Sequence, residues 1–161
     1  MESKETQRMR LKKHGIDARP AFALPSNQKI RSMVTGGARD VIVVVDDDFR
    51  VRESIERLMD SAGYATLVFS SAEEFLRSGT LAKTTCLITD VRMPGMDGLE
   101  LQRRVRLARP ELAVILISAH HDEETRQRAL NQGAAGFLYK PFDAVELLGK
   151  IERALGEPSG D

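Results

Sequence analysis

The chain has 161 residues, with 24 Lys or Arg against 24 Asp or Glu, so its formal net charge is zero. This length suits one domain with a sizeable core plus an extension. No apolar run approaches the roughly 18 residues of a membrane span, and the N-terminus lacks the pattern of a secretory signal. We therefore expect a cytoplasmic protein with no membrane segment. The single cysteine, Cys86, excludes an internal disulfide, and its place in an apolar run predicts core packing.

Charge and composition divide the chain. Residues 1–39 hold nine Lys or Arg against three Asp or Glu, whereas residues 40–161 hold fifteen against twenty-one. The first segment also contains Pro and Gly and lacks a sustained apolar period, which predicts a basic, flexible N-terminal extension. A translation start at Met33 is a further hypothesis for this segment. We expect one domain over 40–156 and a short tail over 157–161. The excess of acidic residues over 40–161 excludes a nucleic-acid backbone as the natural partner of the domain.

From Asp40 onward, short apolar runs alternate with longer amphipathic stretches. This alternation predicts five strand and helix units around a parallel sheet. The strands are expected near Val41–Val45, Ala65–Phe69, Cys86–Thr89, Ala113–Ser118 and Gly136–Tyr139. The helices are expected near Val51–Ala62, Ala72–Ser78, Leu99–Arg109, Glu123–Gln132 and Ala144–Leu155.

Local signals support two of the helix starts and three of the helix ends. Ser71 with Glu74, and Asp143 with Glu146, place a side-chain acceptor at a helix start and an acid three residues later. Glycines expected in the left-handed conformation follow three helices, at Gly63, Gly133 and Gly156. The first and fourth strands are nearly continuous in Val, Ile and Leu, which indicates burial on both faces. The predicted fold class is therefore α/β, a doubly wound, flavodoxin-like (βα)5 domain with a parallel sheet of order 2-1-3-4-5.

Polar residues gather where the predicted strands end. Parallel strands share one carboxyl edge, and ligands bind there near the point where strand order reverses. The residues at this edge are Asp46, Asp47, Asp48, Asp90, Ser118 and Lys140. Mg²⁺ prefers oxygen ligands and accepts one or two carboxylates together with phosphate oxygens. Carboxylates also act as nucleophiles toward phosphorus, so the pattern predicts a site for a divalent cation and a phosphoryl group, with Asp90 as the acceptor.

The order and spacing of these groups resemble the receiver domain of two-component response regulators. Five separated features, which lie between Asp40 and about Gly156, carry the resemblance. They are Asp46-Asp47, Asp90 with its loop Met93-Pro94-Gly95-Met96-Asp97-Gly98, Ser118-Ala119, Phe137, and Lys140-Pro141-Phe142. Arg92 and His120 further resemble the FixJ-type branch of that family.

The resemblance implies a role for each of these positions. Asp90 would accept a phosphoryl group from a histidine kinase or a histidine phosphotransfer protein. Asp47, Asp90 and the backbone carbonyl of Arg92 would ligate Mg²⁺, and Asp46 would orient a metal-bound water. Ser118 and Lys140 would bind the phosphoryl oxygens. The Lys140-Pro141 bond would be cis.

The resemblance also implies a switch. Phe137 would turn inward when Ser118 moves toward the phosphoryl group. The fourth helix, fifth strand and fifth helix of the domain would then change their surface for partner binding or self-association. Arg92 and His120 would tune the lifetime of the phosphoryl group. Such a protein is a signalling switch and not an enzyme with a separate substrate.

Plainer readings of single residues stay open beside these roles. Asp48 suits a solvated or helix-capping acid, and the Ser118 hydroxyl could bond locally at its strand end. Phe137 is a core residue in either state, so plain packing competes with a rotamer switch. His120 and His121 belong to a polar loop that opens a helix, and we expect no transition-metal site there.

A different function is a haloacid-dehalogenase-like phosphatase, since Asp46-Asp47-Asp48 imitates the start of that motif. Arg50 stands where that motif has Thr or Val, and no paired-acid motif follows Lys140. Five residues follow Gly156, which leaves no room for a DNA-binding domain, so we expect a stand-alone receiver that acts through an effector protein or self-association. A piece of a longer regulator would have the same sequence.

Overall fold

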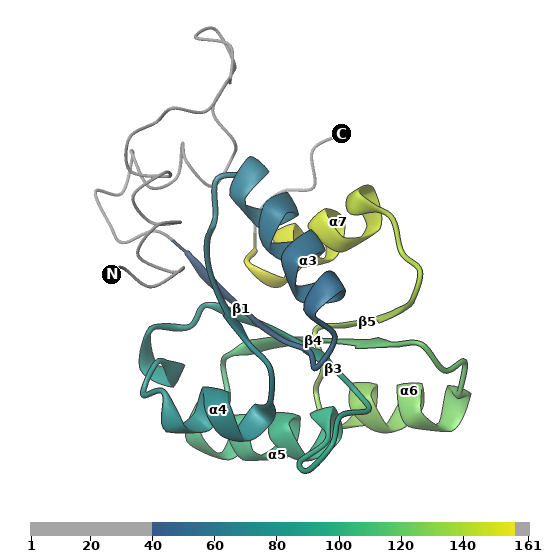
Figure 1. The fold of residues 1–161 in the computed structure, drawn as a ribbon. Helices are drawn as coiled ribbons and strands as arrows, with labels where there is room; N and C mark the ends of the chain where they lie inside the picture. Colours follow the sequence, from purple (N-terminus) through teal and green to yellow (C-terminus); the bar gives the residue numbers. More distant parts are fainter. Residues whose placement is uncertain (1–39, 157–161) are drawn as a thin grey trace, which may run out of the picture.

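The computed structural model describes residues 40–156, so the predicted extension and tail lie outside the described residues. Five strands alternate with five α-helices and one 3-10 helix. In the numbering of Figure 1 they are β1 (Val41–Val45), α3 (Phe49–Ser61), β2 (Ala65–Phe69), α4 (Ala72–Arg77), η1 (Leu81–Lys83), β3 (Cys86–Asp90), α5 (Gly98–Ala108), β4 (Ala113–Ser118), α6 (Glu123–Asn131), β5 (Gly136–Tyr139) and α7 (Ala144–Ala154).

The sheet has the predicted order, β2-β1-β3-β4-β5. All four neighbouring pairs of strands run parallel, and in the pair β1 and β3 Val45 lies opposite Thr89. Helices α3 and α7 cover one face of the sheet, and α4, α5 and α6 cover the other (Figure 1). The strand order reverses between β1 and β3, so the carboxyl ends of these two strands flank the expected ligand position.

The interior consists of two apolar layers, one on each face of the sheet. Alternate residues of each strand enter opposite layers, because successive side chains point to opposite faces. Val43, Leu87 and Leu116 pack with residues of α4, α5 and α6. Ile42, Ile88, Ile115 and Ile117 pack with residues of α3 and α7. This two-sided burial explains why the strands lack an alternation of apolar and polar residues.

Side-chain caps fix where the helices begin. Asp48, Ser71, Asp97, Asp122 and Asp143 each accept a hydrogen bond from a backbone N–H in the first turn of the following helix. Both predicted caps, at Ser71 and Asp143, are therefore confirmed. The three glycines predicted to follow helices have positive φ, at 90° for Gly63, 92° for Gly133 and 75° for Gly156.

The structure differs from the prediction at a few boundaries. Helix α3 begins at Phe49 and not near Val51, because Asp48 caps it through the N–H of Arg50. Strand β3 extends to Asp90, which pairs with Ile117 of β4. The short helix η1 was not predicted, since three residues are too few to show a helical period.

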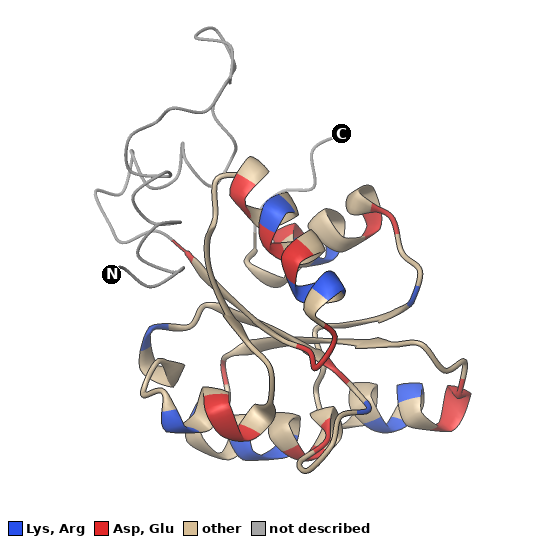
Figure 2. Ribbon diagram, in the orientation of Figure 1, with Lys and Arg blue, Asp and Glu red and all other residues tan. Residues whose placement is uncertain are grey.

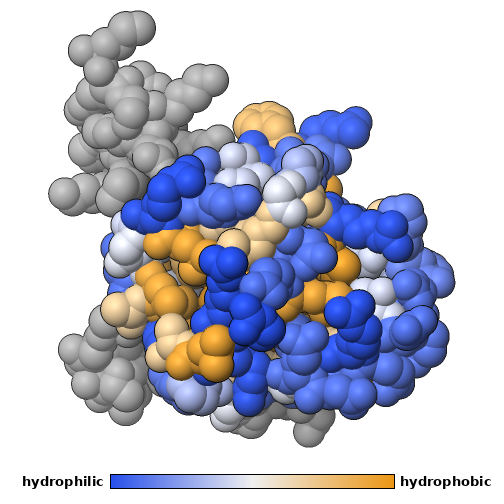
Figure 3. Space-filling model, turned by 90° about the horizontal axis from the view of Figure 1, so that it is seen from below, coloured by the Kyte–Doolittle hydropathy of each residue, from blue (hydrophilic) through white to orange (hydrophobic). Residues whose placement is uncertain are grey.

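The surface of the domain is more polar than its interior. The face in Figure 3, which carries α4, α5 and α6, is mostly hydrophilic, with smaller apolar patches. Cys86 is fully buried, and this burial raises the pKa of its thiol to about 12. Within residues 40–156, no helix combines the length and the apolar character that membrane crossing requires.

Candidate functional site

The turn after β1 carries the first part of the site. Asp46 is fully buried, and its Oδ1 accepts a hydrogen bond of 2.8 Å from the N–H of Asp48. The backbone carbonyl of Asp46 accepts a hydrogen bond of 2.7 Å from Nη1 of Arg52 in α3. Asp47 is exposed beside it. One carboxylate is thus held rigidly by the fold while its neighbour faces solvent.

Asp90 is the last residue of β3 and retains 7% of its surface exposed. The loop after it is closed by two backbone hydrogen bonds, from the N–H of Val91 to the carbonyl of Ile117 at 2.9 Å and from the N–H of Gly98 to the carbonyl of Val91 at 2.8 Å. A Cβ at Gly98 would collide with the backbone carbonyl of Asp90, so only glycine permits this close return of the chain. The carboxylate of Asp90 therefore stands at the sheet edge with little freedom in its backbone.

The three acids form one cluster. Asp46, Asp47 and Asp90 each offer a carboxylate oxygen, and these oxygens lie within 4.8 Å of one another. Figure 2 shows acidic residues together where β1 and β3 end. Mg²⁺ binds oxygen at about 2.1 Å in an octahedron, which places neighbouring ligand oxygens about 3 Å apart and opposite ones about 4 Å apart. The donor set therefore suits Mg²⁺ in its chemistry, and its oxygens lie close enough together to approach this geometry after small side-chain adjustments.

Lys140 bridges two of these acids from the end of β5. Its Nζ lies 3.0 Å from Oδ2 of Asp46 and 3.4 Å from Oδ1 of Asp90. The backbone N–H of Lys140 donates to the carbonyl of Ser118, and the Lys140-Pro141 bond is cis, as the resemblance implied. Burial lowers the pKa of Lys140, but its hydrogen bonds and attraction to Asp46 and Asp90 outweigh this effect, so its pKa is raised and the ammonium stays charged.

The charge balance of the cluster perturbs Asp90. Burial raises the pKa of Asp90 to about 6, the negative charge of Asp46 adds to this, and Lys140 opposes it. Ionised acids in this position repel one another. A bound cation relieves that repulsion and also neutralises charge on a phosphoryl group.

Ser118 ends β4 and is buried at 2% exposure. Its Oγ donates to the carbonyl of His120 at 3.2 Å and accepts from the N–H of His120 at 3.1 Å. The hydroxyl is thus bonded locally, which was the plainer of the two readings for this residue. Both partners of the hydroxyl are backbone groups of His120, in the loop that follows β4.

The remaining predicted residues lie around this centre. Arg92 and His120 are exposed in the loops after β3 and β4. Hydrogen bonds from Thr125 are the main cause of the lowered pKa of Asp122, and the positive charge of Arg92 adds to it. Phe137 is 8% exposed and belongs to the core layer on the face covered by α4, α5 and α6. Its ring meets the ring of Tyr139 edge-on, with 5.3 Å between the ring centroids. Asp48 caps α3, so its capping role is confirmed.

Three contributors to the site had no role assigned to them from the sequence. Arg52 holds the carbonyl of Asp46, Gly98 permits the tight return beside Asp90, and Glu73 of α4 reaches the loop after β3. Gly98 carried a signal, because it stands at a helix start between a capping acid and an apolar residue. Arg52 and Glu73 carried none, since both sit among other charged residues of amphipathic helices.

The phosphatase alternative is not favoured. That reading requires Asp46 to attack phosphorus, yet Asp46 is fully buried and bound to Lys140 and the N–H of Asp48. Asp90 keeps some solvent access and a raised pKa. Asp46 is therefore less accessible to a phosphoryl donor than Asp90 or the exposed Asp47.

Known proteins provide a separate comparison. The family model of the response regulator receiver domain matches residues 42–152. The transcriptional regulatory protein FixJ of Azorhizobium caulinodans is 41% identical over 113 residues, which is 70% of this chain and 54% of that protein. The response regulator protein TodT of Pseudomonas putida is 42% identical over 115 residues, or 71% of this chain and 51% of that protein. The chain thus matches about half the length of these curated relatives.

Solved structures agree with this comparison. The receiver domain protein from Clostridium thermocellum superposes with a TM-score of 0.70 at 30% identity, over 73% of this chain and 94% of that one. The structure titled FixJ-N has a TM-score of 0.67 at 31% identity, over 78% of this chain and 100% of that one. The fold, the acidic edge and the sequence match agree, and the chain belongs to the response regulator receiver domain family.

Proposed function

We propose that Asp90 accepts a phosphoryl group from a histidine kinase or a histidine phosphotransfer protein in a Mg²⁺-dependent reaction. The observation that carries this proposal is the cluster of three carboxylates bridged by one ammonium at the carboxyl edge of β1, β3 and β5. Mg²⁺ held by Asp47, Asp90 and the carbonyl of Arg92 would supply charge neutralisation at the phosphoryl group. Asp46 would orient a water on the ion.

This chain's own groups divide the remaining work. Asp90 attacks phosphorus as a carboxylate, which forms an acyl phosphate and releases the donor's leaving group. Lys140 is charged and already lies 3.4 Å from Asp90, so it is placed to pair with a phosphoryl oxygen. The hydroxyl of Ser118 breaks its hydrogen bonds to the backbone of His120 and donates a hydrogen bond to another phosphoryl oxygen. The protein then loses the group by hydrolysis and acts as a signalling switch with no separate substrate.

Arg92 and His120 are proposed to set the lifetime of the acyl phosphate. Both side chains are exposed, and both follow the strands that carry Asp90 and Ser118. Side chains over this position would limit the approach of water to phosphorus. Their exposure supports this role, because it leaves them free to cover or uncover the site.

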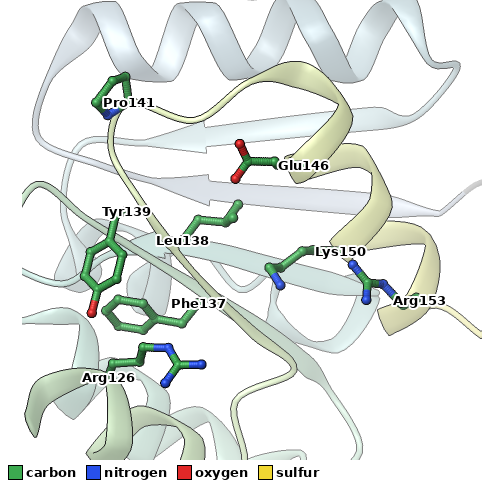
Figure 4. Close-up of a pocket in the computed structure, with 8 residues that line it drawn as sticks. All are labelled: Arg126, Phe137, Leu138, Tyr139, Pro141, Glu146, Lys150 and Arg153. Carbon is green, nitrogen blue, oxygen red and sulfur yellow. The ribbon is translucent and has the colours of Figure 1, made fainter. Parts of the chain in front are cut away.

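The proposed output surface is the one formed by α6, β5 and α7. A pocket of about 410 Å³ opens there, lined by Arg126, Phe137, Leu138, Tyr139, Pro141, Glu146, Lys150 and Arg153 (Figure 4). Phe137 belongs to the core layer and also lines this pocket, so a change in its rotamer would alter the surface. An effector protein or a second copy would bind there after phosphorylation. A cytoplasmic location stays a prediction.

Incubation with Mg²⁺ and acetyl phosphate tests the proposal. We expect the mass increment of one phosphoryl group, sensitive to hydroxylamine, in the wild type and in Asp48→Asn. Asn caps a helix as well as Asp does, so Asp48→Asn is a matched control for the loss of a nearby acid. Asp90→Asn should carry no increment. An increment that survives in Asp90→Asn would refute Asp90 as the acceptor.

A further inference from the structure

The loop between β3 and α5 is held at a third point by a side chain. Oε2 of Glu73, in the first turn of α4, accepts a hydrogen bond of 3.0 Å from the N–H of Met96. The two residues are 23 positions apart in sequence. The other two attachments of this loop, at Val91 and Gly98, are made by backbone groups alone. Glu73 is thus an attachment from another helix that a side-chain substitution can remove.

The loop is shaped to receive this carboxylate. Gly95 has φ of +77°, and a Cβ at this position would lie 2.5 Å from Oε2 of Glu73. Glycine at 95 therefore permits both the turn and the close approach of the acid. Met93 of the loop is 8% exposed and belongs to the core layer that also contains Phe75 of α4. Helix α4 and the loop thus share an apolar layer and are joined by a charge-assisted hydrogen bond.

A role in capping alone does not explain Glu73. The neighbouring Glu74 also lies in the first turn of α4, and it is exposed and bonds to Ser70 close by. The hydrogen bond from Met96 is the largest cause of the lowered pKa of Glu73, so the carboxylate stays ionised and remains a strong acceptor. Of these two adjacent acids, Glu74 accepts a hydrogen bond from nearby Ser70, and Glu73 accepts one from the distant loop.

The loop carries one of the proposed metal ligands and directly follows another, Asp90. Arg92, whose carbonyl is the proposed backbone ligand, lies between Val91 and the residues that Glu73 fixes. Groups that orient metal ligands from outside the coordination sphere affect metal affinity about 10-fold or more when they are removed. We propose that Glu73 is a positioning residue that fixes the loop after Asp90 and thereby sets the affinity of the site for Mg²⁺. This inference rests on the proposed function for the identity of the ion.

The test uses the ¹⁵N-labelled full chain, in which amide exchange of Met96 is measured without metal and Mg²⁺ is then titrated. Glu73→Ala should accelerate exchange at Met96 and weaken Mg²⁺ binding about 10-fold. Glu73→Gln keeps a carbonyl acceptor for the Met96 N–H and should recover most of the affinity. Glu74→Ala, the matched control on the same turn, should behave as the wild type. The thermal midpoint of each variant separates loop positioning from a general loss of stability.

A second perturbation reaches the same contact from the loop. Gly95→Ala should displace the Glu73 carboxylate and weaken Mg²⁺ binding in the wild type, and it should add less in the Glu73→Ala background, since the contact is already lost. Unchanged Met96 exchange or unchanged Mg²⁺ affinity in Glu73→Ala would overturn the inference, as would Glu73→Gln behaving like Glu73→Ala. Absence of phosphorylation in the wild type would overturn the proposed function and leave the Mg²⁺ comparison intact.

Discussion

Strand β3 contains two regions with opposite energetics only two residues apart. Ile88 is fully buried in an apolar layer, where its contacts with α3 and α7 residues stabilise the fold. Asp90 ends the same strand next to Asp46, and its pKa is raised to about 6 because burial and a neighbouring acid disfavour its charge. The interior of the strand therefore stabilises the fold, whereas the closely spaced acids at its tip destabilise it.

The largest expected effect is a loss at the interior position. Ile88→Ala removes a buried side chain from between the sheet and its covering helices, and we expect the free energy of unfolding to fall by about 4 kcal/mol. Urea denaturation measures this change. Leu107→Ala is the control, because Leu107 is an apolar residue that is 75% exposed. Equal effects of the two substitutions would remove the contrast between interior and surface.

The next substitution lies at the end of β3 and should stabilise the fold. Asp90→Asn removes a charge that the metal-free fold disfavours, so it should raise the free energy of unfolding at pH 7.5. The pKa shift from 3.8 to about 6 corresponds to about 3 kcal/mol. Urea denaturation in the presence of a chelator measures the gain. A loss of stability in Asp90→Asn would contradict the assigned repulsion.

The same residue predicts a pH dependence. The folded state holds the Asp90 proton more tightly than the unfolded state does, so ionisation destabilises the fold as pH rises from 3.8 toward 6. The stability difference between Asp90→Asn and the wild type should therefore grow through this window and level off above it. Because other acids titrate here with lowered pKa values, the difference between the two proteins is the quantity to compare. A constant difference across the window would argue against the raised pKa.

A smaller effect should come from Mg²⁺. Binding to the folded state at tenfold excess over the dissociation constant adds about 1.4 kcal/mol to the free energy of unfolding. Asp90→Asn should gain less, because it lacks one proposed ligand and the charge that the ion relieves. Thermal midpoints with and without Mg²⁺, at constant ionic strength, measure the gain, and Na⁺ serves as the control. Identical gains in both proteins would place the ion elsewhere.

Much of the fold followed from residue patterns because apolar runs and caps are local signals. Ser71 and Asp143 marked helix starts, and the apolar runs marked the strands, of which β1, β2, β4 and β5 have the predicted bounds. Asp90 was placed just beyond its strand, although it pairs in the ladder with Ile117. A pairing partner is a tertiary contact, so the run of apolar residues could not reveal it.

The site, like the fold, was predictable only in part from the sequence. The grouping of Asp46, Asp47 and Asp90 was predictable, because parallel strands bring their carboxyl ends to one edge. The local bonding of Ser118 and the contact between Glu73 and Met96 were not predictable. They depend on side-chain rotamers and on how one helix sits against one loop, and neither leaves a period or spacing in the sequence.

The isolation of Cys86 has a practical consequence. It is the one cysteine of the chain, and its thiol is fully buried with a pKa near 12, so it stays protonated and inaccessible to alkylating reagents at neutral pH. A cysteine introduced at Val145, which is 80% exposed in the first turn of α7, would then be the sole thiol to react with a maleimide dye. A protein with this one substitution therefore accepts a site-specific fluorescent label with no need to replace Cys86.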